Sequence, residues 1–278
     1  FVGSVDVYKR QALRSVQYIR MTPMTLPHQT IHNWQVMLPK VAQMQTDGFG
    51  NQWLTLSRHE PHNNLQIQAF GEVEINADTL FIPDNQQVPY QIFAVPTKLT
   101  QCSEAMREFA HDALEQFLQS EDIDAQLAIL KSLAKDLLDK MPYTKSVTHV
   151  GTTAEQAFAM AAGVCQDHTH VFLALLRDKG IAARYVSGYI YEATQAHMAS
   201  HAWAEVWLAG NWYTFDISNQ HFTPNCHVYI AFGRDYADAA PVRGVRTGGG
   251  DERLYSQVMV STSPQYIPQL NAQFAAQQ

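Results

Sequence analysis

Three residues that lie far apart in the sequence have the types needed for nucleophilic chemistry on an amide carbonyl. Cys165 follows Gly163-Val164 and opens a segment with helical periodicity, His201 opens an extended segment, and Asp216 lies in the next extended segment. A thiol at a helix N-terminus is close to the positive end of the helix dipole and to N–H groups that can stabilise an oxyanion. Both effects favour the thiolate, which is the reactive form. On position alone, a buried structural cysteine is an equally good interpretation of Cys165.

A catalytic thiol needs a base within hydrogen-bond reach, and that base needs an orienting group. The extended segments of His201 and Asp216 are joined by a tight turn near Gly210. If Ala209-Gly210 forms the loop, His201 pairs with Ser218 and becomes a diagonal neighbour of Asp216, roughly 7 Å away at the backbone. A Gly210-Asn211 loop would separate the two residues by about four positions along the strand, or ~13 Å. The chemistry therefore predicts the first register, or an equivalent loop or bulge, and the sequence does not choose between them.

Metal binding is an alternative for the helix that begins at Cys165. Cys165, His168 and His170 are zinc-ligand types, but positions i, i+3 and i+5 of a helix do not converge on one ion. We therefore interpret Asp167 and His168 as supporting residues near the helix start. We expect no metal and no cofactor.

The elements that must position these residues have helices first and strands afterwards. Apolar stripes predict helices from Ser103 to about Gln119 and over about 124–140. Thr152 and Glu155 fit a capping box, which predicts a short helix that ends before Gly163, and Gly180 should end the Cys165 helix. Strands are expected over 182–191, 202–208, 212–217, 228–232 and 254–260. This order is typical of an α+β fold rather than a doubly wound one.

Three tryptophans belong to the same strand pair as His201. In the favoured register, Trp203, Trp207 and Trp212 would lie on the His201 face. They could wall a cleft, although aromatic pairs on strands more often serve packing alone.

The N-terminal third of the chain is predicted to be β-rich. Extended runs recur about every ten residues, at 15–21, 32–38, 52–56, 65–70 and 73–75, with turn signals such as Asp47-Gly48, Asn63-Asn64 and Gly71 between them. This pattern favours a sandwich or an open barrel. Prolines at 83, 89 and 96 mark a boundary. We therefore predict a β-rich N-terminal domain at 1–95, a catalytic core at 96–262, and a polar tail at 263–278 whose Gln- and Ala-rich composition favours disorder.

Composition and charge argue against several classes of protein. The chain has 19 Lys and Arg against 26 Asp and Glu, and this net charge of −7 argues against a general nucleic-acid binder. No apolar run of about 18 residues predicts a membrane-spanning helix. Three cysteines do not make a disulfide framework, which favours a reducing, cytoplasmic location. The chain begins with Phe1 rather than Met, so a removed signal peptide and export stay open, as does the oligomeric state.

Several segments resemble, in order, the motifs of the transglutaminase-like superfamily in its bacterial branch. Residues 163–167 resemble the nucleophile motif, residues 180–189 the strand that follows, residues 200–206 the histidine strand, and residues 212–219 the aspartate strand. In the last of these, Ile217-Ser218 stands where a Pro-Thr pair is more usual. Residues 233–238 and 241–244 resemble a signature of the bacterial branch. Residues 20–23 and 47–51 resemble the domain that precedes the core in that branch.

This resemblance implies a papain-like transglutaminase core after a β-rich N-terminal sandwich. It implies a Cys165, His201 and Asp216 triad, no metal, and acyl transfer at amide bonds through a thioester, with a peptide or protein as substrate. Water as acceptor gives a protease or amidase, and a lysine amine gives a transglutaminase. We favour hydrolysis, because bacterial members are often described as presumed cysteine proteases. A non-catalytic peptide-binding module on the same fold is the alternative. Tyr143 is a candidate second oxyanion donor, or a packed core tyrosine.

Overall fold

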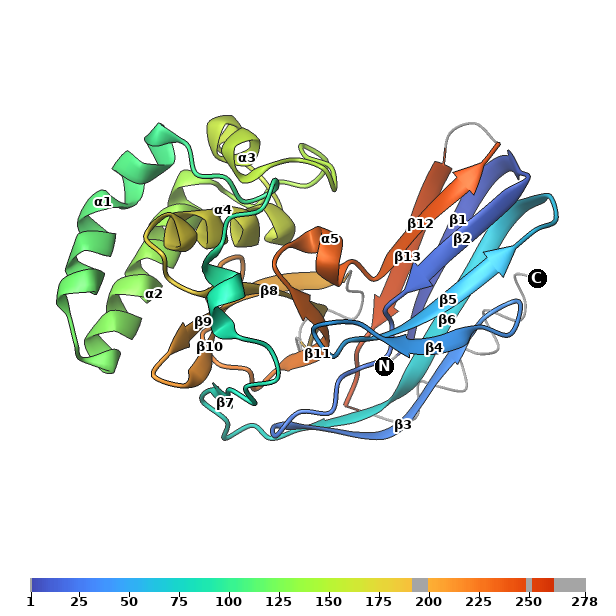
Figure 1. Cartoon of the computed structure of the whole chain (residues 1–278), viewed down its shortest axis with the longest axis horizontal. Coiled ribbons are helices and arrows are strands. Elements are labelled where there is room, and N and C mark those ends of the chain that lie inside the picture. Colours follow the sequence, from blue (N-terminus) through green and yellow to red (C-terminus); the bar gives the residue numbers. More distant parts are fainter. Residues whose placement is uncertain (1, 192–199, 249–251, 263–278) are drawn as a thin grey trace.

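A computed structural model of the chain describes residues 2–191, 200–248 and 252–262. Two sheets lie at one end of the molecule, and helices cover a third sheet at the other end (Figure 1). This mixed architecture confirms the predicted α+β class. The tail predicted at 263–278 lies outside the described residues.

Strands and helices come in blocks along the described chain: strands first, then helices, then mostly strands. The strands are β1 (Val2–Ala12), β2 (Arg14–Ile19), β3 (Gln29–Met37), β4 (Gln43–Thr46), β5 (Gln52–Arg58), β6 (His62–Ile75), β7 (Ile82–Pro83), β8 (Ala183–Ile190), β9 (His201–Leu208), β10 (Asn211–Phe215), β11 (His227–Gly233), β12 (Val242–Thr247) and β13 (Glu252–Met259). The helices are the 3-10 helix η1 (Tyr90–Ala94) and the α-helices α1 (Glu104–Gln119), α2 (Ile123–Lys140), α3 (Ala154–Met160), α4 (Cys165–Asp178) and α5 (Tyr236–Ala239).

The two N-terminal sheets have four strands each, in the orders β13-β1-β6-β3 and β12-β2-β5-β4. Alternate residues of β6 are buried, namely Leu65, Ile67 and Ala69, and they form a core with Leu54 and Leu56 of β5. A period of two is what a strand with one buried face requires. The two sheets therefore share one apolar layer.

Both sheets of this sandwich are completed by strands from the other end of the chain. β12 pairs with β2, and β13 pairs with β1, in each case antiparallel. Our predicted boundaries place both segments in the core at 96–262, so the strand pairing crosses those boundaries. Local patterns give the strands, but the choice of partner depends on tertiary packing.

The prediction of two short strands around a turn at Gly71 is wrong, because β6 runs through this position without a break. Gly71 lies opposite Trp34, beside a bulge in β3. A Cβ atom at Gly71 would lie 1.9 Å from the Asn33 carbonyl oxygen and 2.7 Å from Trp34 Cα. This glycine therefore allows the close approach of a neighbouring backbone and does not form a turn.

The third sheet, in the order β11-β8-β9-β10-β7, holds the predicted catalytic histidine. Helix α4 packs on one face of it, against β8 and β9. The opposite face buries Trp203 and Trp212 beside Phe93 and Tyr229. Every residue of β8 is buried, as expected for a strand whose two faces are both covered.

A loop from the N-terminal part of the chain is hydrogen-bonded to the third sheet at β11. The Asn51 side chain, which is fully buried, exchanges two hydrogen bonds with the backbone of Phe232 in β11, of 2.8 and 2.9 Å. Asp47 accepts hydrogen bonds from Asn51 and from the backbone of Phe49, so that the loop keeps its shape. The motif at 47–51 thus has a structural role.

Helix ends follow the local signals with one exception. Ser103 caps α1, and Gly180 lies just after α4 with a φ of +73°, where a C-terminal cap is expected. The capping box of α3 is formed by Thr153 and Gln156, so the predicted pair of Thr152 and Glu155 is wrong by one residue. The buried Thr152 hydroxyl instead accepts from the backbone N–H of His149, in the preceding turn.

The hairpin between β9 and β10 has the register that the chemistry required. Trp212 pairs with Trp207, and Phe215 pairs with Ala204, so that Ala209 and Gly210 form a two-residue loop. Both loop residues have positive φ, of 46° and 84°. Two positive φ angles are the mark of a type I′ turn, whose twist matches that of the flanking strands.

Ala209→Asn is expected to stabilise the protein by roughly 1 kcal/mol, because asparagine tolerates left-handed backbone better than alanine. Ala209 is exposed, so the new side chain meets no steric obstacle. Chemical denaturation of the variant and the parent measures the difference. Gly210→Ala is the control and should be destabilising; equal stability of all three proteins would contradict the assigned turn.

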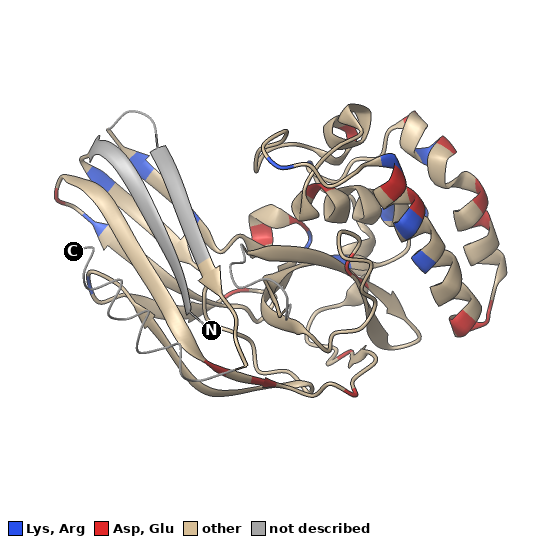
Figure 2. Cartoon of the chain, turned by 180° about the vertical axis from the view of Figure 1, so that it is seen from behind, with Lys and Arg blue, Asp and Glu red and all other residues tan. Residues whose placement is uncertain are grey.

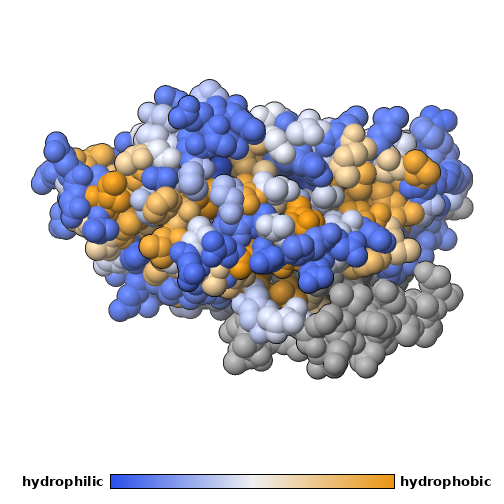
Figure 3. Space-filling view, turned by 90° about the horizontal axis from the view of Figure 1, so that it is seen from below, coloured by the Kyte–Doolittle hydropathy of each residue, from blue (hydrophilic) through white to orange (hydrophobic). Residues whose placement is uncertain are grey.

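Residues of both charge signs occur close together along the helices. Lys and Arg are interspersed with Asp and Glu, most of them on the helices, in the view of Figure 2. On the face seen from below, small apolar areas are separated by polar residues (Figure 3). Among the described residues, no helix is long and apolar enough to span a bilayer.

Candidate active site

Cys165 is the first residue of α4, and two neighbours shape the turn that precedes it. The Asp167 carboxylate accepts hydrogen bonds from the Val164 N–H, at 2.8 Å, and from the Thr148 hydroxyl, at 2.6 Å. A Cβ atom at Gly163 would lie only 2.7 Å from the Asp167 Cβ, so this position needs glycine. The prediction of Asp167 as a supporting residue agrees with these contacts.

The start of α4 offers backbone donors beside the thiol. The first intrahelical hydrogen bond runs from the His168 N–H to the Val164 carbonyl, at 3.0 Å, so the N–H groups of Cys165, Gln166 and Asp167 have no intrahelical carbonyl to bind. Such groups carry the positive end of the helix dipole and can hold an anion. Cys165 itself is partly exposed, as a nucleophile must be.

His201 and Asp216 meet as the register predicts. His201 Nε2 lies 2.7 Å from Asp216 Oδ2, with 10% of the histidine side chain exposed and none of the aspartate. Because Nε2 is engaged by the carboxylate, Nδ1 is the ring nitrogen left for a thiol. His201 begins β9 and Asp216 directly follows β10, so the hairpin determines this contact.

Each member of the His201–Asp216 pair stabilises the charged form of the other. Burial by itself would lower the pKa of His201, but the charge and hydrogen bond of Asp216, together with a hydrogen bond that His201 donates to Cys165, raise that pKa to about 10. Burial would raise the pKa of Asp216, but the charge of His201 and the hydrogen bonds of His201 and His227 hold that pKa far below its usual range. Near neutral pH the group is therefore an imidazolium paired with a carboxylate.

Two further residues hold Asp216 that our sequence analysis did not assign to the site. Asn219 donates its side-chain N–H to Oδ2, at 2.9 Å, and its backbone N–H to Oδ1, at 3.2 Å. His227 Nε2 lies 3.1 Å from Oδ2. A histidine at the head of the apolar run 228–232 was the signal available in the sequence for His227.

The zinc interpretation of the α4 histidines does not fit their contacts. His168 reaches the Met141 carbonyl with Nε2, at 2.7 Å, and the Ser218 hydroxyl with Nδ1, at 2.8 Å. His170 Nε2 instead accepts from the backbone N–H of Tyr236. His168 therefore ties α4 to the segment after Asp216, which agrees with a supporting role.

Among the described residues, a different group brings metal-ligand types together, namely His201, Asp216 and His227, with ligand atoms within 4.8 Å of one another. Their mutual distances of 2.7 and 3.1 Å are those of hydrogen bonds. Asp216 and His227 are also fully buried. A hydrogen-bonded group explains this arrangement without an ion.

The aromatic residues around the site have separate roles. The Trp203 ring lies 6.0 Å from that of His201 and packs behind it. Trp207 stacks on Tyr90 at 3.8 Å and lies outside the site, and Trp212 is buried in the core. Tyr143, the candidate oxyanion donor, is bridged through its backbone to Gly163, and its side chain is half exposed.

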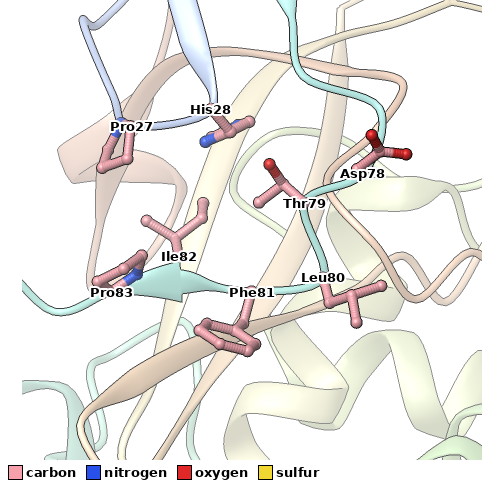
Figure 4. A pocket seen from close by; sticks show the side chains of 8 residues that line it. All are labelled: Pro27, His28, Asp78, Thr79, Leu80, Phe81, Ile82 and Pro83. Carbon is pink, nitrogen blue, oxygen red and sulfur yellow. The ribbon is translucent and has the colours of Figure 1, made fainter.

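A hollow of about 350 Å³ lies between the β3 side of the sandwich and β7. In Figure 4, Ile82 points toward His28 and Thr79, whereas Phe81 and Leu80 point to the other side of their segment. The lining residues are Pro27, His28, Asp78, Thr79, Leu80, Phe81, Ile82 and Pro83. None of the three predicted catalytic residues lines it. The hollow is therefore separate from the candidate active site.

The other two cysteines differ from Cys165 in their surroundings. None of the three forms a disulfide bond. Burial raises the pKa of the Cys102 thiol to about 11, which makes it a poor nucleophile. Cys226 Sγ lies 3.7 Å from His227 Nδ1. Only Cys165 combines partial exposure with a helix N-terminus and a nearby charged histidine.

Comparisons with known proteins agree with the architecture. Residues 114–217 match the model of the transglutaminase-like superfamily, and residues 7–74 match that of the bacterial transglutaminase-like N-terminal region. An uncharacterized protein of Mycobacterium leprae is 26% identical over 258 residues, which are 88% of this chain and 91% of that protein. One from Mycobacterium tuberculosis is 27% identical over 237 residues, 74% of this chain and 73% of that protein.

A solved structure shares the fold over nearly the whole chain. It is described as "a Putative Cysteine Protease from Cytophaga hutchinsonii", and the superposition has a TM-score of 0.69 at 20% identity. It covers 95% of this chain and 92% of that one. Both the sandwich and the helical core therefore have counterparts in one other protein.

Proposed function

Since this chain belongs to the transglutaminase-like superfamily, with the N-terminal region of its bacterial branch, we propose that it is a cysteine hydrolase that cleaves amide bonds in peptides or proteins. Cys165 is the nucleophile, His201 the base, and Asp216 the group that orients His201. The observation that carries the proposal is the 2.7 Å contact of His201 with Asp216, next to a thiol at the N-terminus of α4.

The chemistry follows the accepted logic of covalent catalysis. The Cys165 thiolate attacks the amide carbonyl carbon, and N–H groups at the start of α4 stabilise the oxyanion. The tetrahedral adduct collapses, and the leaving amine takes a proton from His201. His201 then removes a proton from water, which attacks the thioester and releases the acid. Asp216 keeps the Nε2 proton in place, so that Nδ1 exchanges protons with the reacting groups.

Transglutaminase activity is the second candidate, because the same thioester can be attacked by a lysine amine. The two outcomes differ by mass. A glutamine peptide should gain about one mass unit by deamidation or be cleaved by hydrolysis, whereas a primary amine would leave an adduct. We expect hydrolysis as the main product when the enzyme acts on candidate peptides with and without added amine. An amine adduct as the main product would overturn that preference.

The partner we propose is a peptide or protein. The net charge of −7 supports this over nucleic acid, and we propose no membrane partner. The cysteines without disulfide bonds support a cytoplasmic location, which cell fractionation would test against export. A non-catalytic peptide-binding module is the remaining alternative, and the Cys165 variant described in the Discussion separates it from an enzyme.

A further inference from the structure

The Asp216 carboxylate lies between two imidazole rings. His201 contacts Oδ2 at 2.7 Å, and His227 contacts the same oxygen at 3.1 Å. The ring centroids of the two histidines are 6.3 Å apart. His201 is the one that reaches the surface, with 10% of its side chain exposed, whereas His227 is completely enclosed.

The surroundings of His227 determine its charge state. Its ring packs 4.6 Å from Trp203 and 5.6 Å from His221, at the head of the buried strand β11. Burial is the largest influence and lowers the pKa of His227, although the hydrogen bond to Asp216 raises it. His227 is therefore a neutral imidazole at physiological pH.

A neutral imidazole has a single N–H, so the contacts also determine the tautomer. The carboxylate of Asp216 is ionised and can only accept. The proton of His227 must then sit on Nε2, which leaves Nδ1 as the acceptor. Nδ1 faces the Cys226 thiol at 3.7 Å, a weak donor that suits it.

We propose that His227 is a positioning residue for the reaction: its Nε2–H holds Asp216 from the buried side, as Asn219 does from the surface side. This rests on the proposed function. Without His227, the carboxylate would be held only by His201 and Asn219 and by no donor from the buried side. It could then rotate or take up a proton, and His201 would lose its orientation. Since His227 is neutral, it adds a donor without a second positive charge beside His201.

A packing role for His227 makes different predictions. If only volume matters, leucine at this position should serve as well as glutamine. If the N–H matters, His227→Gln should retain function, because its side-chain amide can place an N–H near the original Nε2, and His227→Leu should not. His221→Gln is the matched control, since the His221 side chain bonds Asn225 and not the Asp216 carboxylate.

The first measurement is the imidazole ¹⁵N spectrum of the wild-type protein across pH 7 to 9. We expect His227 to stay neutral, with its proton on Nε2 throughout. A proton on Nδ1, or titration of His227 within that range, would overturn the proposal. This readout needs no catalysis and no variant, so it judges the hydrogen bond even if Cys165 proves unreactive and the proposed function fails.

The second measurement is the rate of Cys165 alkylation by iodoacetamide at pH 7, corrected for the folded fraction. His227→Leu should slow it about ten- to a hundredfold, the factor that corresponds to losing a hydrogen bond to a charged group. His227→Gln should stay within about threefold, and His221→Gln should be unchanged. A reactive wild type with an equally reactive leucine variant, or equal losses in both His227 variants, would contradict the proposal. If the leucine variant does not fold, the spectrum and the glutamine variant still decide.

Discussion

Cys165→Ala is expected to reduce amide hydrolysis by at least about 10⁴-fold and to leave the fold intact. The thioester cannot form without the sulfur, and water activated by His201 alone is a much poorer nucleophile for an amide. Alanine is a strong helix former, and Cys165 is only partly buried, so the substitution should not disturb α4. Turnover of a peptide library read by mass spectrometry, together with circular dichroism, measures both effects.

Cys102→Ala is the matched control for this substitution. Cys102 is also partly exposed, but its thiol has a raised pKa and lies beside Arg107 and Asp178 rather than beside a histidine. This variant should keep full activity. If Cys165→Ala retained turnover, the nucleophile would be another group. If neither variant nor the wild type turned over any peptide while Cys165 stayed unlabelled by iodoacetamide, the binding-module alternative would gain support.

Asp216→Asn is expected to lower turnover by roughly 10³- to 10⁴-fold, with the backbone unchanged. An amide can donate to His201 Nε2, which drives the histidine proton to Nδ1. Nδ1 is the nitrogen that faces the thiol, so it could no longer accept the proton of Cys165. The loss comes from the wrong tautomer and not from the loss of a contact.

The same variant should change the pH dependence of Cys165 alkylation. In the wild type, Asp216 is the main reason that the pKa of His201 is raised to about 10, so the imidazolium is present from low pH up to that value. Its charge stabilises the thiolate throughout this range. In Asp216→Asn, burial dominates and the imidazolium is lost above its ordinary pKa of about 6.5 or lower. The Cys165 thiolate should then lose the positive charge that favours it.

Near neutral pH, alkylation of the variant should therefore be slower by about ten- to a hundredfold, the factor that corresponds to losing one interaction with a charged group. The alkylation rates of the two proteins should approach each other above about pH 10, where the wild-type His201 loses its charge as well. Asp84→Asn is the control, since Asp84 bonds Trp207 of the same hairpin but has no contact with His201. Superimposable profiles for wild type and Asp216→Asn would refute the role of Asp216.

Much of the candidate site follows from local sequence. The helix that begins at Cys165, the strand that begins at His201 and the cap at Gly180 are confirmed, because periodicity and glycine placement act within one element. The chemistry narrowed the hairpin to one register, in which His201 and Asp216 meet. The Ala209-Gly210 turn has that register, and its positive φ angles explain why.

Two local signals in the sequence led to wrong predictions, because the residue type is explained by contacts outside the predicted element. Gly71 indicated a turn, but glycine is needed there because the paired backbone of β3 leaves no room for a Cβ atom. Thr152 indicated a helix cap, but its hydroxyl is used by the preceding turn. In both cases the residue has a specific structural role, but that role differs from the turn or helix cap that was predicted.

The sequence by itself determined the order of the elements, the helix that presents the thiol and the three residues with catalytic types. Only the tertiary structure decided that β12 and β13 complete the N-terminal sandwich, that Asn51 docks on β11, and that His227 and Asn219 hold Asp216. The physical reason is the distance along the chain over which each kind of interaction acts. Periodicity, capping and turn chemistry act over a few residues, whereas strand partners and the donors to a buried carboxylate are chosen by packing between segments far apart in the chain.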